Sequence, residues 1–193
     1  MKKDKLIKVF RLGFVACFCL SFNGSFAQKS YTKSGKISFY SKAPLEKIEA
    51  VNKTVSAILD SKTGMVQFAV LMKGFEFEKA LMQEHFNENY VESDKYPKAI
   101  FKGVIENSKA TPLNNDNVFT AKVSGTLTLH GVTNPVNTSA VITVKSGIVA
   151  ASCNFSIALD DYKIAIPFLV EDKINKKIAI AVTIPVYQVM AAK

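Results

Sequence analysis

The sequence predicts an all-β protein, built as one eight-stranded antiparallel barrel with one or two short helices. Three observations predict this fold. Apolar and polar residues alternate in eight segments of the chain. Each segment has one polar side, whereas strands of a helix-covered parallel sheet are apolar on both sides. The segments are roughly ten residues long, and closure into a barrel removes the exposed edges that such long strands would otherwise present.

The first 27 residues are predicted to be a signal peptide that is removed on export. Five basic residues precede or border a short apolar run at residues 12–20, and Ser25-Phe26-Ala27 places small residues before a cleavage point. The apolar run is short for a membrane span, although a retained N-terminal anchor helix is the alternative. Residues 28–193 are then expected to form the mature chain as a single domain.

Removal of this segment changes the composition of the chain. It leaves 166 residues, enough for one domain with a sizeable core, and lowers the formal net charge from +9 to +5, with 20 basic and 15 acidic residues. The remaining lysines are scattered, and the one arginine of the chain, Arg11, is lost. Nucleic-acid binders of this size cluster Lys and Arg, so nucleic acid is excluded as a partner.

Alternation defines the predicted strands. In the clearest segment, Phe119, Val123 and Leu127 share one face, and threonines and a lysine share the other. The turn-rich segment at 107–117 reads as a hairpin connection. The predicted strands span residues 31–41, 53–60, 65–73, 98–108, 118–129, 136–145, 149–159 and 177–187.

Two segments between strands are predicted to be short helices against the barrel. In 44–51, Leu45, Ile48 and Val51 have helical spacing, and the proline at position 44 suits a first helical turn. In 77–90, one helix face carries apolar residues together with His85. His85 is therefore either a packed residue of this face or a contact to the head group of a ligand at the barrel mouth.

The alternate residues on the apolar side of each strand define the predicted interior of the barrel. Its side chains are apolar, and they either form the lining of an elongated pocket or fill the barrel completely. The predicted lining residues are Phe68, Val70, Phe101, Phe119, Val123, Leu127, Ile142, Phe155, Ile157, Ile180 and Val182.

Residues that could carry chemistry are few in the mature chain. Cys153 is its single cysteine and has the parity of inward residues, so it is expected to be a small buried side chain rather than a nucleophile. Two histidines and one inward cysteine do not supply the three or four convergent ligands of a metal site. Asp160 and Asp161 are adjacent carboxylates, and turn residues are their ordinary interpretation. No cofactor, metal or catalytic residue is predicted.

His130 interrupts the segment VSGTLTLHGVTNPV (residues 123–136). Its parity is opposite to that of Leu127, and Gly131 and Asn134-Pro135 follow it. We expect His130 to close a corner between two strands by hydrogen bonding to the backbone. A metal ligand and a catalytic base are the alternatives.

The same segment, with LMQEHFNENYVESDKYPKAIFKG at 81–103, resembles the YceI-like family of exported proteins. The likeness extends over roughly residues 34–186. It implies an extended eight-stranded lipocalin-like barrel, in which some members carry a polyisoprenoid or another lipid. The matching positions are Tyr96, Pro97, Phe101, Gly125, Leu127, Thr128, His130, Gly131, Val132, Thr133, Pro135 and Val136.

The resemblance leads to a functional hypothesis. The protein is expected to be a non-catalytic carrier or sequestering protein for a long-chain lipid such as a polyisoprenoid, periplasmic or secreted in a bacterial cell envelope. Helix 77–90 keeps His85 but lacks the arginine found near it in better-known members, so no arginine clamp for a head group is carried over. The alternative is a barrel with a filled core that serves in stress protection or protein interaction; an unrecognised enzyme is a third reading.

Overall fold

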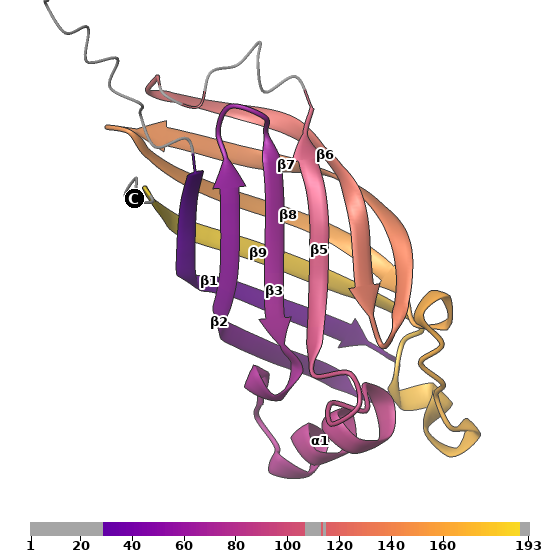
Figure 1. The fold of residues 1–193 in the computed structure, drawn as a ribbon. Coiled ribbons are helices and arrows are strands. Elements are labelled where there is room, and N and C mark those ends of the chain that lie inside the picture. The colour runs from indigo at the N-terminus through magenta and orange to yellow at the C-terminus, as the bar shows by residue number, and fades with distance from the viewer. Residues whose placement is uncertain (1–28, 107–112, 114, 190–193) are drawn as a thin grey trace, which may run out of the picture.

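Eight long strands close into an antiparallel barrel, so the predicted fold class is confirmed (Figure 1). The computed structural model describes residues 29–106, 113 and 115–189, and the predicted signal peptide lies outside them. The order around the barrel is β1-β9-β8-β7-β6-β5-β3-β2, and β1 pairs with β2 to complete the ring. The strands are β1 Lys29–Lys42, β2 Lys47–Asp60, β3 Met65–Leu71, β4 Glu76–Phe77, β5 Lys98–Ile105, β6 Asn117–Leu129, β7 Val132–Lys145, β8 Ile148–Ala158 and β9 Lys177–Val189.

Helical elements gather at one end of the barrel, which we call the mouth (Figure 1). The predicted helix at 77–90 is present as α1 (Ala80–His85) and a single π turn, η2 (Phe86–Tyr90), while Phe77 belongs to the short strand β4. The other elements are the 3₁₀ turns η1 (Met72–Gly74), η3 (Asp160–Tyr162) and η4 (Phe168–Lys173). Within the described ranges, no helix is long and apolar enough to span a bilayer.

The predicted helix at 44–51 is wrong, because β2 already begins at Lys47. Ile48 pairs with Ser41 of β1, and the pairing continues along the whole strand. Ala50 and Asn52 alternate with less buried neighbours and are 1% and 0% exposed, whereas Leu45 lies in the connecting loop and is 70% exposed. Pairing with a long neighbouring strand overrides the helical spacing of three apolar residues.

The strand predicted from residue 136 begins four residues earlier, because His130 and Gly131 form a two-residue hairpin turn. Their φ values are +50° and +74°, and Leu129 pairs with Val132 directly across the turn. Two successive positive φ values give the turn type whose twist matches that of paired strands. Pro135 therefore lies inside β7, opposite Thr126, and is not part of the turn.

The core consists of two adjoining groups of buried side chains inside the barrel. The group near the mouth includes Ala50, Phe75, Tyr162 and Ile178, all at most 7% exposed. The group at the far end includes residues of β2, β7 and β9 that are about as deeply buried. Partly buried side chains packed against both groups are Ile37, Phe68, Phe101, Phe155 and Ile180. The interior is therefore apolar along the length of the barrel.

Candidate functional site

Two apolar cavities lie inside the barrel. The inner cavity, about 100 Å³, is lined by strand residues such as Leu59, Ile142 and Tyr187. The mouth cavity, about 480 Å³, is lined by strand residues and also by Phe86 of η2 and Val170 of η4. The mouth cavity has the size of a small-molecule site, and predominantly apolar walls are typical of such sites. Residues that line both cavities are Ile37, Val70, Ala99, Leu127 and Phe155, so the two cavities adjoin.

The predicted interior residues lie around these cavities, with one exception. Those on the inner cavity are Phe68, Val70, Phe101, Val123, Leu127, Ile142, Phe155 and Val182. Those on the mouth cavity are Val70, Leu127, Phe155, Ile157 and Ile180. Phe119 lines neither cavity and packs against the far-end group of the core. A ligand role for these residues remains a prediction.

Aromatic rings at the mouth were not predicted as part of the site. Phe86 stacks on Phe39 with 5.5 Å between ring centroids, and it contacts Phe75 and Phe77 at 5.6 and 5.1 Å. All four rings line the mouth cavity. Phe39 has the same parity as Ile37 on β1, so its inward direction was readable from the sequence. The contacts of Phe75 and Phe77 instead follow from the η1 turn and the short strand β4.

Polar side chains at the mouth cavity are few. Nζ of Lys79 lies 3.1 Å from a carboxylate oxygen of Glu46, and Lys173 and Ser41 also line this cavity. His85 is exposed at the end of α1 and lines the same cavity. The prediction that His85 packs on an apolar helix face is therefore not met, and its position suits the other expectation, a contact to a polar head group.

Two paired glycines explain why the phenylalanine after Tyr96-Pro97 has room in the wall. Gly103 of β5 is directly opposite Gly125 of β6. A Cβ atom added to either glycine would come within 2.7 Å of Cζ of Phe101. Side chains at these positions would drive the ring of Phe101 toward the inner cavity, because its present place would be occupied.

His130 holds three segments together at the mouth. Its Nδ1 lies 3.0 Å from the carbonyl oxygen of Tyr162, and its Nε2 lies 2.7 Å from Oε2 of Glu92. Its ring also meets the ring of Tyr96 edge to face at 4.7 Å. Both partner atoms are oxygens that can accept a hydrogen bond from a protonated ring nitrogen. We call Glu92, Tyr96, His130 and Tyr162 the corner cluster.

The corner cluster bears out the expectation that His130 bonds to backbone at a strand corner, and adds the carboxylate of Glu92 as a second hydrogen-bond partner. Glu92 has φ +45°, so both members of the pair adopt a backbone conformation that is uncommon outside glycine. The ring of Tyr96 covers Gly131, where an added Cβ would lie 2.6 Å from Cε1 of Tyr96. This packing explains why the tyrosine, the histidine and the glycine occur together in the two sequence blocks.

Other candidate groups do not form a reactive site. Asp160 and Asp161 are exposed in η3 and line neither cavity. In the part of the chain that the structure describes, no three His, Cys, Asp or Glu side chains gather as metal ligands. Cys153 lines the inner cavity, and burial raises the pKa of its thiol from 9.0 to about 11 because the thiolate loses solvation.

Cys153 provides a chemical probe of the cavity. With its raised pKa, a thiol at pH 8 is about 100-fold less ionised than one with the ordinary value, and the thiolate is the reactive form. We expect iodoacetamide to alkylate native mature protein at pH 8 at least about 100-fold more slowly than urea-unfolded protein. The rate should rise as the pH is increased toward 11. Native alkylation as fast as that of the unfolded chain would contradict the placement of Cys153 in the wall.

Solved structures share this architecture. A polyisoprenoid binding domain from Saccharophagus degradans, implicated in plant cell wall breakdown, is 15% identical, with a TM-score of 0.74 over 85% of this chain and 99% of that one. BcnA from Burkholderia cenocepacia is 17% identical, with a TM-score of 0.64 over 79% and 95%. A YceI protein from Campylobacter jejuni is 20% identical, with a TM-score of 0.53 over 74% and 85%.

Sequence comparison gives the family. The curated proteins contain no match to this chain. The family profile described as the YceI-like domain matches residues 13–186. This range includes the corner cluster and the whole barrel except the last three residues of β9. The chain therefore belongs to the YceI-like family.

Proposed function

We propose that this protein is an exported carrier or sequestering protein that holds the apolar chain of a lipid, such as a polyisoprenoid, inside its barrel. The observation that carries this proposal is the pair of adjoining apolar cavities, of about 480 and 100 Å³, the larger of which is lined by elements of the mouth. The fold shared with a polyisoprenoid binding domain supports the choice of ligand class. The basic and apolar N-terminal segment supports export to the periplasm or beyond.

The affinity of the apolar interior for a lipid chain would be set by the length of that chain. Each methylene that leaves water contributes about 0.8 kcal/mol, so ten of them contribute about 8 kcal/mol before the cost of ordering the chain. Residues 28–193 contain no arginine, so a charged head group has no bidentate clamp. The head group would instead remain at the mouth, beside Lys79, His85 and Lys173.

The proposal assigns no chemical step to the protein. The mouth side chains Lys79 and Glu46 pair with each other, and no nucleophile beside a base is found among the described residues that line the cavities. Cys153 is held as a thiol by burial. A barrel with a completely filled core is disfavoured by the volume of the mouth cavity, because closely packed cores leave few voids larger than a water molecule.

Titration with isoprenoid alcohols of increasing length tests the proposal. We expect the affinity of the mature protein to rise with each added isoprene unit until the cavities are filled, and to depend little on replacing the alcohol with a phosphate. A matched control is His85→Ala at the mouth, which should leave the dependence of the affinity on chain length unchanged. Equal affinity for short and long chains, or no binding of any, would overturn the proposed function.

A further inference from the structure

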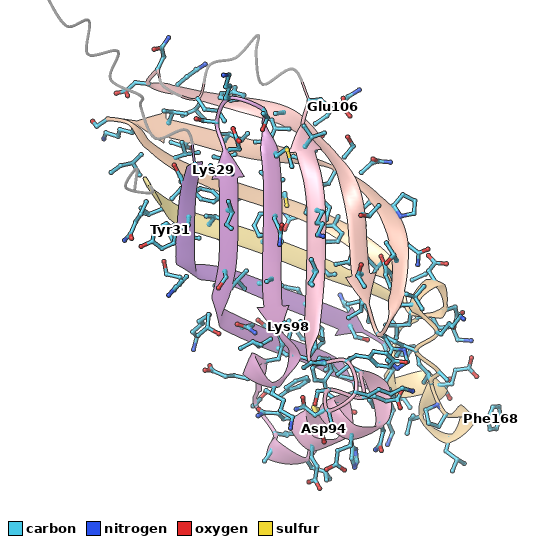
Figure 2. The ribbon with its side chains drawn as sticks, viewed as in Figure 1. Lys29, Tyr31, Asp94, Lys98, Glu106 and Phe168 are labelled. Carbon is cyan, nitrogen blue, oxygen red and sulfur yellow. The ribbon has the colours of Figure 1, made fainter. Side chains whose placement is uncertain are left out.

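Two large apolar side chains project into solvent beside the mouth cavity. Phe168 and Leu169, at the start of η4, are 86% and 90% exposed. Figure 2 shows Phe168 pointing away from the barrel, at the end that carries α1. We call these two residues the apolar tip. Adjacent large hydrophobic side chains in contact with water are unfavourable, so such pairs indicate a surface that binds another apolar surface.

The apolar tip is joined directly to the cavity wall. Val170, the next residue, lines the mouth cavity, and Lys173 and Ile174 line it further along. The segment is fixed to the barrel after η4, where the backbone N–H of Asn175 donates to Oγ of Ser41 at 2.8 Å. The segment 168–174 thus directs Val170, Lys173 and Ile174 to the mouth cavity, while the apolar tip points to solvent.

The size of the apolar tip fits a lipid surface better than a protein. An aromatic side chain and a leucine together offer on the order of 300 Å², while each partner in the smallest stable protein interfaces contributes about 600 Å². Two protruding side chains on a short turn suit insertion between lipid head groups, where the apolar acyl region begins within about 10 Å of the surface.

The segment that carries the apolar tip, residues 160–177, holds equal numbers of basic and acidic residues. Lysines 163, 173, 176 and 177 stand against Asp160, Asp161, Glu171 and Asp172. Nζ of Lys176 is paired with Glu171 at 2.6 Å. This balance gives no net attraction to an anionic surface, in contrast to the polybasic segments that bind anionic lipids. Contact with a membrane would therefore depend on apolar insertion and would be insensitive to salt.

We propose that the apolar tip docks the mouth of the barrel onto a neutral, zwitterionic lipid bilayer, where the protein exchanges its lipid. This inference rests on the proposed function, because the ligand of the cavity would itself be a membrane component. Docking at this end places the mouth cavity against the acyl region, so an apolar chain passes between membrane and barrel with little exposure to water. The segment η4 then forms one wall of the path and also anchors it to the bilayer.

The absence of tryptophan from the chain allows a direct test of docking. The variant Phe168→Trp of the mature protein carries a single tryptophan at the apolar tip. With phosphatidylcholine vesicles we expect a blue shift of its emission and quenching by brominated acyl chains, at both low and high salt. The matched control is Val118→Trp, at the start of β6 at the opposite end of the barrel, where Val118 is 65% exposed. The control should show neither change; quenching of both variants or of neither would overturn the inference.

Removal of the apolar tip separates docking from lipid binding. In the double variant Phe168→Ser/Leu169→Ser, the affinity for phosphatidylcholine vesicles, measured by flotation, should fall about 100-fold, roughly tenfold for each side chain. Transfer of a polyisoprenol from vesicles should slow in parallel, while binding of the same lipid from detergent solution stays unchanged. Val118→Ser should behave as the wild type in all three measurements.

The outcomes distinguish the inference from the proposed function. Unchanged vesicle flotation and transfer in the double variant, with lipid binding intact, would overturn the inference alone. Docking that depends on the apolar tip, with no lipid taken up from any source, would overturn the proposed function and the exchange of lipid, but not the docking of the mouth onto a bilayer. A wild type that is dimeric, ignores vesicles and becomes monomeric in the double variant would show the apolar tip to be a contact between two copies of the chain, and would also overturn the inference.

Discussion

Replacing Leu127 with tryptophan should weaken the binding of long isoprenoid chains about 100-fold and leave short chains nearly unaffected. Leu127 is 9% exposed and lines both cavities, so its side chain lies where they adjoin. Phe101 is its partner across the β5–β6 pair and narrows the same level of the barrel. An indole here would confine a ligand to the mouth cavity. Loss of about four methylene contacts is worth roughly 3 kcal/mol, or about 100-fold in affinity.

The stability of this variant separates a cavity from a filled core. Extra side-chain volume in a well-packed interior destabilises a protein by about 1–3 kcal/mol, whereas a cavity can accept it. We therefore expect Leu127→Trp to unfold within about 1 kcal/mol of the wild type. Val141→Trp is the matched control, because Val141 is 45% exposed on β7 and lines neither cavity. A Leu127→Trp protein that is strongly destabilised, or that binds long and short chains as the wild type does, would contradict this account.

Replacing His130 with alanine should lower the free energy of unfolding by about 2 kcal/mol, through loss of two hydrogen bonds and one ring contact. Most of this loss is expected from the hydrogen bond to Tyr162, because Tyr162 is 2% exposed while the side chain of Glu92 is 43% exposed. For a chain of this size the melting temperature should fall by roughly 4–8 °C. Binding of an isoprenoid by the folded variant should change little, because His130 lines neither cavity.

Two further variants distinguish the contacts of His130 from the strain of its backbone. Asparagine is a preferred residue at the first position of this turn type, so His130→Asn keeps the backbone conformation. Its shorter side chain cannot form the hydrogen bonds to Glu92 and Tyr162. We expect it to be destabilised nearly as much as the alanine variant, and a double-mutant cycle with Glu92→Gln to show coupling of at least about 0.5 kcal/mol. His85→Asn, at the exposed histidine, is the control and should be neutral. Full stability of His130→Asn, or stable protein that has lost ligand binding, would reverse the assignment.

The strands were predictable because each is apolar on one side. The alternation of Phe119, Val123 and Leu127 needs no knowledge of the neighbouring strands, since a one-residue slip would turn every apolar side chain outward. The length of the strands indicated that the sheet closes into a barrel, and the family resemblance implied the same closure. The failure at 44–51 has the opposite cause: Leu45, Ile48 and Val51 fit a helix locally, and only the pairing of β2 with β1 decides the conformation.

The candidate site was predictable in its walls but not at its mouth. Ten of the eleven interior residues predicted from strand parity line one cavity or both, and Phe119 is the exception. The corner cluster joins Glu92 to His130 and Tyr162, which are far apart in the chain, and no periodicity relates them. The direction of Phe168 likewise depends on how η4 crosses the barrel end. Such contacts arise between elements, so single-segment patterns do not contain them.

The lipid content of protein isolated from its own source tests the central claim, that the barrel carries an apolar chain, most directly. Native mass spectrometry of the exported protein, followed by extraction, identifies any molecule held in the cavities. We predict one long-chain lipid per barrel, reduced in Leu127→Trp and retained in Val141→Trp. Wild-type protein that is free of lipid, and that also takes up no polyisoprenol from detergent solution, would contradict the account.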